Sequence, residues 1–168
     1  VGACKELVTV LFAKGIQNIA YLGSNMDQMV NRCRYQGYEE AYRKGKRKLN
    51  QDLVYTDLSS RAMVEKAVEE LKKSGVECIL CQDDYICDEV VRKLARMGVR
   101  IPDQMKVASC HYSRILENYP VTITSLKFNI TELGRRSCQV LLDMIHGKTV
   151  PDKTLLDYEI ILKESTKG

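Results

Sequence analysis

The chain has 168 residues, of which 45% are hydrophobic and 29% are charged, a balance typical of an ordinary globular domain with a sizeable core. Its 26 basic and 22 acidic residues leave a net charge of only +4, which is too small to indicate nucleic-acid binding by itself. With 7% aromatic residues and no tryptophan, the chain offers few rings on which single-stranded nucleic acid could stack.

The sequence carries no sign of export or of membrane insertion. No apolar run approaches the roughly 18 residues of a membrane span, and no signal-peptide pattern opens the chain. Seven cysteines, an odd number with several members inside apolar runs, indicate reduced core cysteines in a cytoplasmic protein and no disulfide framework. Because the chain opens at Val1 without an initiator methionine, we expect a piece of a longer or processed protein.

The first half of the chain alternates between helical and extended hydrophobic periods. Ser60 is a predicted N-cap, and Gly15 and Gly75 are predicted helix stops. The continuous apolar run over residues 78–81 is typical of a strand buried on both faces. Helices are predicted over residues 3–14, 27–44 and 60–73, and strands over residues 18–22, 53–55 and 78–81. The apolar face of the second helix is predicted to carry Met29, Val30, Cys33, Gly37, Ala41 and Tyr42.

The second half continues the same alternation. Predicted in order are a helix over residues 85–97, a turn at 101–103, a strand over 106–110, an irregular loop over 111–121, an extended segment over 121–127, a helix over 130–146 and a strand over 155–162. Strands that alternate with helices of about ten or more residues form right-handed βαβ units. The sequence therefore predicts an α/β fold, with a mostly parallel sheet between two layers of helices.

Polar residues follow three of the predicted strands. In an open parallel sheet, ligands bind beyond the carboxyl ends of the strands. The end of any strand also leads into a polar loop, so the position of these residues fits a ligand site and an ordinary surface loop equally well. One of the two aspartates at 83 and 84 is also expected to cap the following helix. The residues at these strand ends are Ser24 and Asn25, then Gln82, Asp83 and Asp84, then His111, Tyr112 and Ser113.

Three chemical alternatives are weaker. An enzyme would need a nucleophile, a base and an orienting group, and no local signature links the candidates. Cys78 and Cys81 have a zinc-like spacing, but in a strand their thiols point to opposite faces, so core packing is favoured over a metal site. The basic run over residues 43–48 is better explained by a solvated helix C-terminus, which attracts cations, than by nucleic-acid binding.

Short motifs in a fixed order resemble the effector-binding domain of the LacI/GalR transcriptional regulators, from Gly2 to Thr166. They include an Arg-x-x-Gly-aromatic helix at residues 34–38 and a Gly-x-x-Ile-Pro-like segment at residues 98–102. Each motif alone is weakly specific, and their order and intervals carry the resemblance. The seven pieces are Gly2-Ala3 with Gly15, residues 18–23, residues 34–38 with Ala41, residues 79–84, residues 97–103, Thr124-Ser125 with Leu133-Gly134, and residues 164–166.

This resemblance implies a type I periplasmic-binding-protein-like fold, of which the chain is mainly the C-terminal lobe. Residues 1–124 would form that lobe, residues 125–150 would cross as a strand and helix to the N-terminal lobe, and residues 151–168 would return as a strand and tail. The crossing piece should expose apolar surface unless a second chain covers it. The resemblance also implies a homodimer that binds DNA only through a separate domain absent from this chain, with no cofactor, metal, membrane or catalysis.

The resemblance also implies particular effector-binding residues. Arg34 matches the family's effector-contacting arginine, whose planar fork suits hydroxyls or a carboxylate. His111 occupies a position where many members have aspartate, and an imidazole can donate, accept and carry charge. Leu58 falls near a position that is often aromatic. The implied effector-contacting residues are Arg34, Asp84, His111, Asp83, Asn25 and Phe128, the last in place of a polar residue, and Tyr119 falls in the dimer region.

The sequence therefore favours the ligand-sensing domain of a bacterial transcription regulator. Its effector would be a sugar, a sugar phosphate or a nucleobase-like molecule, because the departures from the sugar-binding pattern admit more than a plain sugar. The alternatives are a solute-binding receptor of a sugar transporter, which shares the fold, and an enzyme that depends on Asp84 or His111.

Overall fold

A six-stranded sheet forms the centre of the computed structural model, which describes all residues 1–168. The strands are β1 (Ile19–Leu22), β2 (Val54–Tyr55), β3 (Cys78–Cys81), β4 (Lys106–Ser109), β5 (Thr124–Phe128) and β6 (Tyr158–Ile161). Their spatial order is β2-β1-β3-β4-β5-β6; the first five are parallel, and β6 runs antiparallel to β5. The predicted mostly parallel sheet is confirmed.

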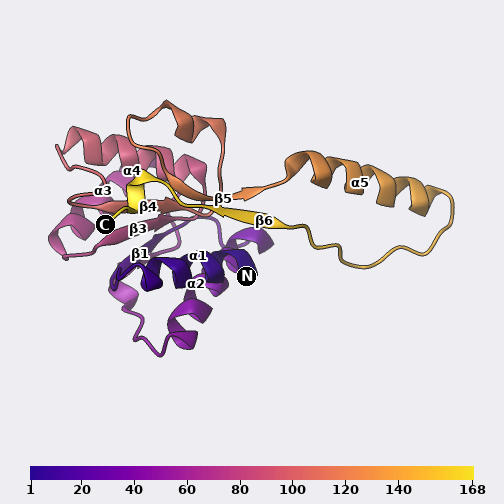
Figure 1. Cartoon of the computed structure of the whole chain (residues 1–168), viewed down its shortest axis with the longest axis horizontal. Coiled ribbons are helices and arrows are strands. Elements are labelled where there is room, and N and C mark those ends of the chain that lie inside the picture. Colours follow the sequence, from indigo (N-terminus) through magenta and orange to yellow (C-terminus); the bar gives the residue numbers. More distant parts are fainter.

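Helices cover both faces of this sheet. They are α1 (Gly2–Ala13), α2 (Met29–Lys44), α3 (Arg61–Lys73), α4 (Asp84–Arg96) and α5 (Ile130–Ile145), with 3-10 turns at Gln51–Leu53, Arg114–Asn118 and Glu164–Thr166. In Figure 1, α1 and α2 lie on one side of the strands, and α3 and α4 lie on the other. The predicted three-layer α/β sandwich is therefore confirmed. Part of the loop predicted over residues 111–121 is the second of these 3-10 turns.

The core consists of two apolar clusters, one on each face of the sheet. Cys78 belongs to the cluster under α1 and α2, whereas Cys81 belongs to the cluster under α3 and α4. Both side chains are fully buried, and burial raises the pKa of the Cys78 thiol. The two thiols thus point to opposite faces of the sheet, because successive side chains of a strand alternate between the faces. The predicted role of this pair in core packing is confirmed.

The first turn of α2 differs from the prediction. Met29 and Val30 were expected on the apolar face of the helix, yet their exposed fractions are 72% and 50%. At this end the helix instead buries the polar Asn31, whose side-chain amide binds the loop after β1. Its buried face lies further along, where the Tyr38 and Tyr42 hydroxyls both donate to the Ile19 carbonyl at 2.7 and 3.0 Å.

The α5 helix extends away from the rest of the molecule, as Figure 1 shows for the orange segment. It begins at the end of β5, and the chain returns from it through residues 151–157 into β6. None of its residues is buried. Its exposed large apolar residues are Ile130, Leu133, Leu141, Leu142, Met144 and Ile145. The apolar surface expected for this part of the chain is present.

No helix in the structure has both the length and the apolar character needed to cross a bilayer.

Candidate functional site

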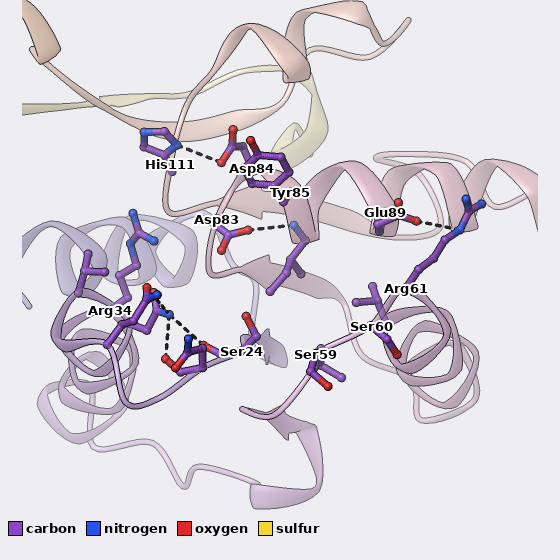
Figure 2. Close-up of a pocket in the computed structure, with 17 residues that line it drawn as sticks. Ser24, Arg34, Ser59, Ser60, Arg61, Asp83, Asp84, Tyr85, Glu89 and His111 are labelled. Carbon is purple, nitrogen blue, oxygen red and sulfur yellow. Dashed lines mark hydrogen bonds and ion pairs between the residues drawn. The ribbon is translucent and has the colours of Figure 1, made fainter.

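An open cavity of about 540 Å³ lies at the carboxyl ends of the parallel strands (Figure 2). It receives side chains from the loops after β1, β2, β3 and β4 and from the helices α2, α3 and α4. The structure brings together in it five of the six effector-binding residues predicted from sequence: Asn25, Arg34, Asp83, Asp84 and His111. Phe128 and Tyr119 lie elsewhere.

The loop after β1 is held in place by two buried amides. Gln82, fully buried, accepts the Ser24 backbone N–H at its Oε1, with a distance of 3.2 Å. Asn31 donates from its Nδ2 to the carbonyls of Ser24 and Asn25, each at 3.0 Å. A Cβ added to Gly23 would lie 2.5 Å from the Gln82 Oε1 and 2.7 Å from the Tyr21 Cε1, so a larger residue there would have to displace the Gln82 amide that holds the loop. The polar wall that carries Ser24 and Asn25 is therefore rigidly positioned.

Asp83 is the N-cap of α4. Its Oδ1 accepts the Ile86 backbone N–H at 2.9 Å, and its Oδ2 lies 3.5 Å from the Gln82 side-chain amide. The expectation that one of the two aspartates caps the helix is confirmed. Because both carboxylate oxygens already have partners in the protein, the primary role of Asp83 in this structure is to fix the start of α4.

The contribution of the Asp83 cap to stability can be measured by substitution. We expect Asp83→Ala to lower the free energy of unfolding by about 1 kcal/mol, because the first turn of α4 loses an acceptor for a free backbone N–H. Asp83→Ser keeps an oxygen that can cap and should cost only a fraction of that amount. Urea denaturation of both variants measures the difference, and equal stability of the two would show that the cap contributes nothing.

Asp84 and His111 form a pair across the cavity. The His111 Nδ1 lies 3.1 Å from the Asp84 Oδ1, with Asp84 buried and His111 half-buried. Burial raises the pKa of the Asp84 carboxyl, but hydrogen bonds from Ser113 and His111 outweigh burial and bring the pKa below its usual value. An ionised Asp84 only accepts, so it holds the proton of the imidazole on Nδ1 and leaves Nε2 as the atom available to a ligand.

Arg34 reaches into the cavity from α2. Figure 2 shows its guanidinium extending from the helix toward Asp83 and His111. The side chain is half-buried, and it makes neither a hydrogen bond nor an ion pair with another residue of the chain. A guanidinium provides five N–H donors in a fixed plane, so this side chain is well suited to an oxygen-rich ligand.

Reasoning from sequence missed several residues of the cavity, among them Tyr85, Arg61 and Glu89. Tyr85 follows Asp84 at the start of α4 and is 71% exposed, an unusual position for a large ring. Arg61, in the first turn of α3, forms an ion pair with Glu89 at 3.2 Å. The only sequence signal for Tyr85 was its place directly after the strand-end aspartates. Leu58 cannot offer a stacking surface, because it is buried in the core.

Phe128 lines a second hollow, of about 580 Å³, at the root of α5. His111 borders this hollow as well as the first cavity, so the two spaces meet at its imidazole. Tyr119 lies on the outer side of α4, where its hydroxyl hydrogen-bonds the Asp88 carboxylate and, at 3.3 Å, the Asp88 carbonyl. The predicted residues thus fall into one main cavity, one adjoining hollow and one outer surface.

A three-layer α/β lobe with a polar cavity at its strand ends is the architecture of two-lobed ligand-binding proteins. The chain belongs to the periplasmic binding protein-like domain family, whose model matches residues 8–166. Among curated proteins it is 25% identical over 168 residues to the HTH-type transcriptional regulator CelR of Thermobifida fusca, covering 98% of this chain and 49% of that protein. It is 24% identical over 160 residues to the HTH-type transcriptional regulator GntR of Escherichia coli K12, covering 91% of this chain and 46% of that protein.

Solved structures show the same fold. The transcription regulator CcpA of Lactococcus lactis superposes with a TM-score of 0.86 at 23% identity, covering 99% of this chain and 61% of that one. A CelR–cellobiose complex superposes with a TM-score of 0.86 at 24% identity, covering 98% and 51%. The resemblance to LacI/GalR-type regulators is confirmed, and the chain spans about half the length of the curated relatives it matches.

These relatives are transcription regulators and not enzymes. The structure contains no group of three or more histidine, cysteine, aspartate or glutamate side chains arranged to hold a metal ion.

Proposed function

We propose that this chain is the effector-sensing part of a cytoplasmic transcription regulator and that a small polar molecule binds in the strand-end cavity. One observation carries the proposal: polar side chains from separate strand-end loops and from α2 converge on one open cavity in a chain whose relatives are regulators. Asn25, Arg34, Asp84 and His111 would contact the effector, and Asp83 would support them by fixing α4. The complex of CelR with cellobiose supports a sugar-like ligand.

A second lobe would complete the site. The cavity is open on the side away from the sheet, and α5 extends from the body with an uncovered apolar face. We assign residues 1–124 to one lobe, residues 125–150 to a strand and helix that pack into the other lobe, and residues 151–168 to the return strand and tail. The relatives, about twice as long as this chain, have room for that lobe and for a DNA-binding domain. Phe128, at the root of the crossing segment, would then line the effector site from its edge.

Effector binding would act by population shift. An effector that contacts both lobes binds the closed arrangement better than the open one, and the difference in affinity sets how far the equilibrium can move. In a homodimer that pairs through α4 and Tyr119, closure would change the distance between the two DNA-binding domains. The effector would therefore alter DNA affinity by reciprocal coupling.

The test measures DNA binding by the intact protein that contains this chain. Sugars, sugar phosphates and nucleobases are added in turn, and the affinity for operator DNA and the heat of ligand binding are recorded. For the ligand that acts, we expect Arg34→Met to weaken ligand affinity at least about tenfold, because charge-assisted hydrogen bonds are lost. Arg43→Met, at the exposed end of the same helix, is the matched control and should leave it unchanged. If no small molecule alters DNA affinity, the sensing proposal is wrong.

A further inference from the structure

The carboxylates of the cavity are already engaged within the protein. Both oxygens of Asp83 face backbone or amide hydrogens at the start of α4. Asp84 is held by His111 and by Ser113. Glu89 faces Arg61 at 3.2 Å. Each of the three carboxylates therefore has a contact within the protein, although the Glu89 Oε2 faces Arg61 without a hydrogen bond.

The cationic side of the cavity is different. Arg34 is half-buried and has no carboxylate partner, although Asp83 lies in the same cavity. A half-buried guanidinium without a counter-charge has given up hydration without receiving charge-assisted hydrogen bonds in return. The imidazole of His111 stands on the same side of the cavity, and Asp84 beyond it is placed to stabilise a proton on the ring. Because Arg61 is already paired with Glu89, a ligand would meet one unpaired permanent cation, Arg34, and one group that can become a cation, His111.

We infer, building on the sensing function proposed above, that the effector carries an oxyanion, and that this group binds between the Arg34 guanidinium and a protonated His111. The imidazole keeps its Nδ1–H directed at Asp84 and takes up a proton on Nε2, which then donates to the oxyanion. A carboxylate and a phosphate share this chemistry, so a sugar acid and a sugar phosphate both satisfy it. An uncharged sugar gains neither the ion pair nor the proton uptake.

The surroundings of His111 permit this proton uptake. On the cavity side, the ionisable groups are Arg34, Arg61, Asp83, Asp84, Tyr85 and Glu89. On the side of the second hollow they are Tyr112, Arg114, Lys127, Asp157, Tyr158 and Glu159. Only Asp84 touches the ring among these side chains, at 3.1 Å, and the opposite charges on the far side balance. Asp84 accepts the ring Nδ1–H whether or not Nε2 carries a proton, and a bound anion would lie between the ring and Arg34.

The pH dependence differs between the two classes of anion. A carboxylate ligand stays ionised in this range and pulls a proton onto His111, so its affinity rises as pH falls through the imidazole titration. A phosphate ester takes up a proton of its own at about pH 6, so its affinity rises and then falls again as pH falls. On the alkaline side of that titration the gain is at most about tenfold per pH unit, since one proton is taken up per ligand. Binding of an uncharged sugar has no such slope.

Inorganic phosphate and acetate serve as probes of the intact protein, so the test can be run without the effector itself. The titration of the His111 imidazole is followed by NMR in each salt and in chloride at equal ionic strength. We expect His111 to titrate at higher pH with phosphate or acetate than with chloride. A shift with either probe shows that an oxyanion binds beside His111, and titration with a sugar acid and a sugar phosphate then distinguishes the two classes of effector. His146, at the far end of α5 and outside the lining of both hollows, is the internal control and should not respond.

Two variants distinguish the effect of charge at His111 and Arg34 from a general disturbance of the folded site. His111→Gln keeps a polar side chain of similar reach but cannot be protonated, so residual acetate binding through Arg34 should lose its dependence on pH. Arg34→Met should abolish the response of His111 to both probes, whereas Arg43→Met should preserve it. The His111 signal itself reports that the folded site is present, so a misfolded variant is recognised and replaced by Arg34→Gln.

The outcomes distinguish this inference from the proposed function. If phosphate and acetate leave the His111 titration where chloride puts it, the oxyanion site is wrong. The inference also fails if the molecule that alters DNA affinity is uncharged and binds equally well across the pH range. In that second case the sensing function stands and only the ligand class is overturned.

Discussion

Gly37→Val is expected to lower the free energy of unfolding by about 3 kcal/mol, because α1 and α2 pack closely at this glycine. A Cβ at Gly37 would overlap the Val1 carbonyl oxygen and would lie 2.9 Å from the Cys4 Cβ and 3.0 Å from the Lys5 backbone nitrogen. Two of these three atoms belong to the backbone of α1 and the residue before it, so no side chain can turn away. The helices would have to separate, and the fully buried Leu7 and Tyr38 would lose contacts.

Gly134→Val is the matched control for this substitution. Gly134 also lies inside a helix, and nothing stands within 4 Å of its added Cβ. Intrinsic helix propensity slightly favours valine over glycine at both positions, so the two variants differ only in the space around the residue. Thermal and urea unfolding of both proteins give the comparison. If the two substitutions have the same effect, close packing of α1 on α2 is not what requires glycine at position 37.

Ser165→Ala is expected to lower the free energy of unfolding by about 2–4 kcal/mol, because it leaves two buried backbone groups without a partner. The fully buried Ser165 hydroxyl accepts the Thr124 N–H at 2.8 Å and donates to the Val107 carbonyl at 2.6 Å. It thereby joins the C-terminal turn to both β4 and β5. Alanine fits the space but can make neither hydrogen bond, and water has no access to replace them.

Two other substitutions give the free energies of unfolding with which Ser165→Ala is compared. Ser137→Ala removes a hydroxyl from the exposed face of α5 and should be close to neutral. Thr166→Val removes the bond of 2.7 Å between the Thr166 and Thr124 hydroxyls, and should cost less than Ser165→Ala because Thr124 keeps the Lys163 backbone N–H as a partner at 2.9 Å. Denaturant unfolding of the three variants would contradict the argument if Ser165→Ala were as stable as Ser137→Ala.

The sequence by itself determined the fold class and the edge of the sheet at which polar residues gather. Short apolar runs and helix caps depend on neighbouring residues only, so the strand over residues 78–81 and the Ser60 cap could be predicted from the local sequence. The rule for open parallel sheets then placed Asn25, Asp84 and His111 at one edge. The structure brings all three into the same cavity.

The tertiary structure decided everything that depends on residues distant in the chain. Asp83 and Asp84 are adjacent and chemically identical, yet one caps α4 and the other holds His111, because the loop after β4 passes only one of them. Ser165 meets partners 41 and 58 residues away, a contact that no local pattern encodes. Likewise, the absence of a carboxylate partner for Arg34 is a property of the assembled cavity and could not be read from its neighbours in the sequence.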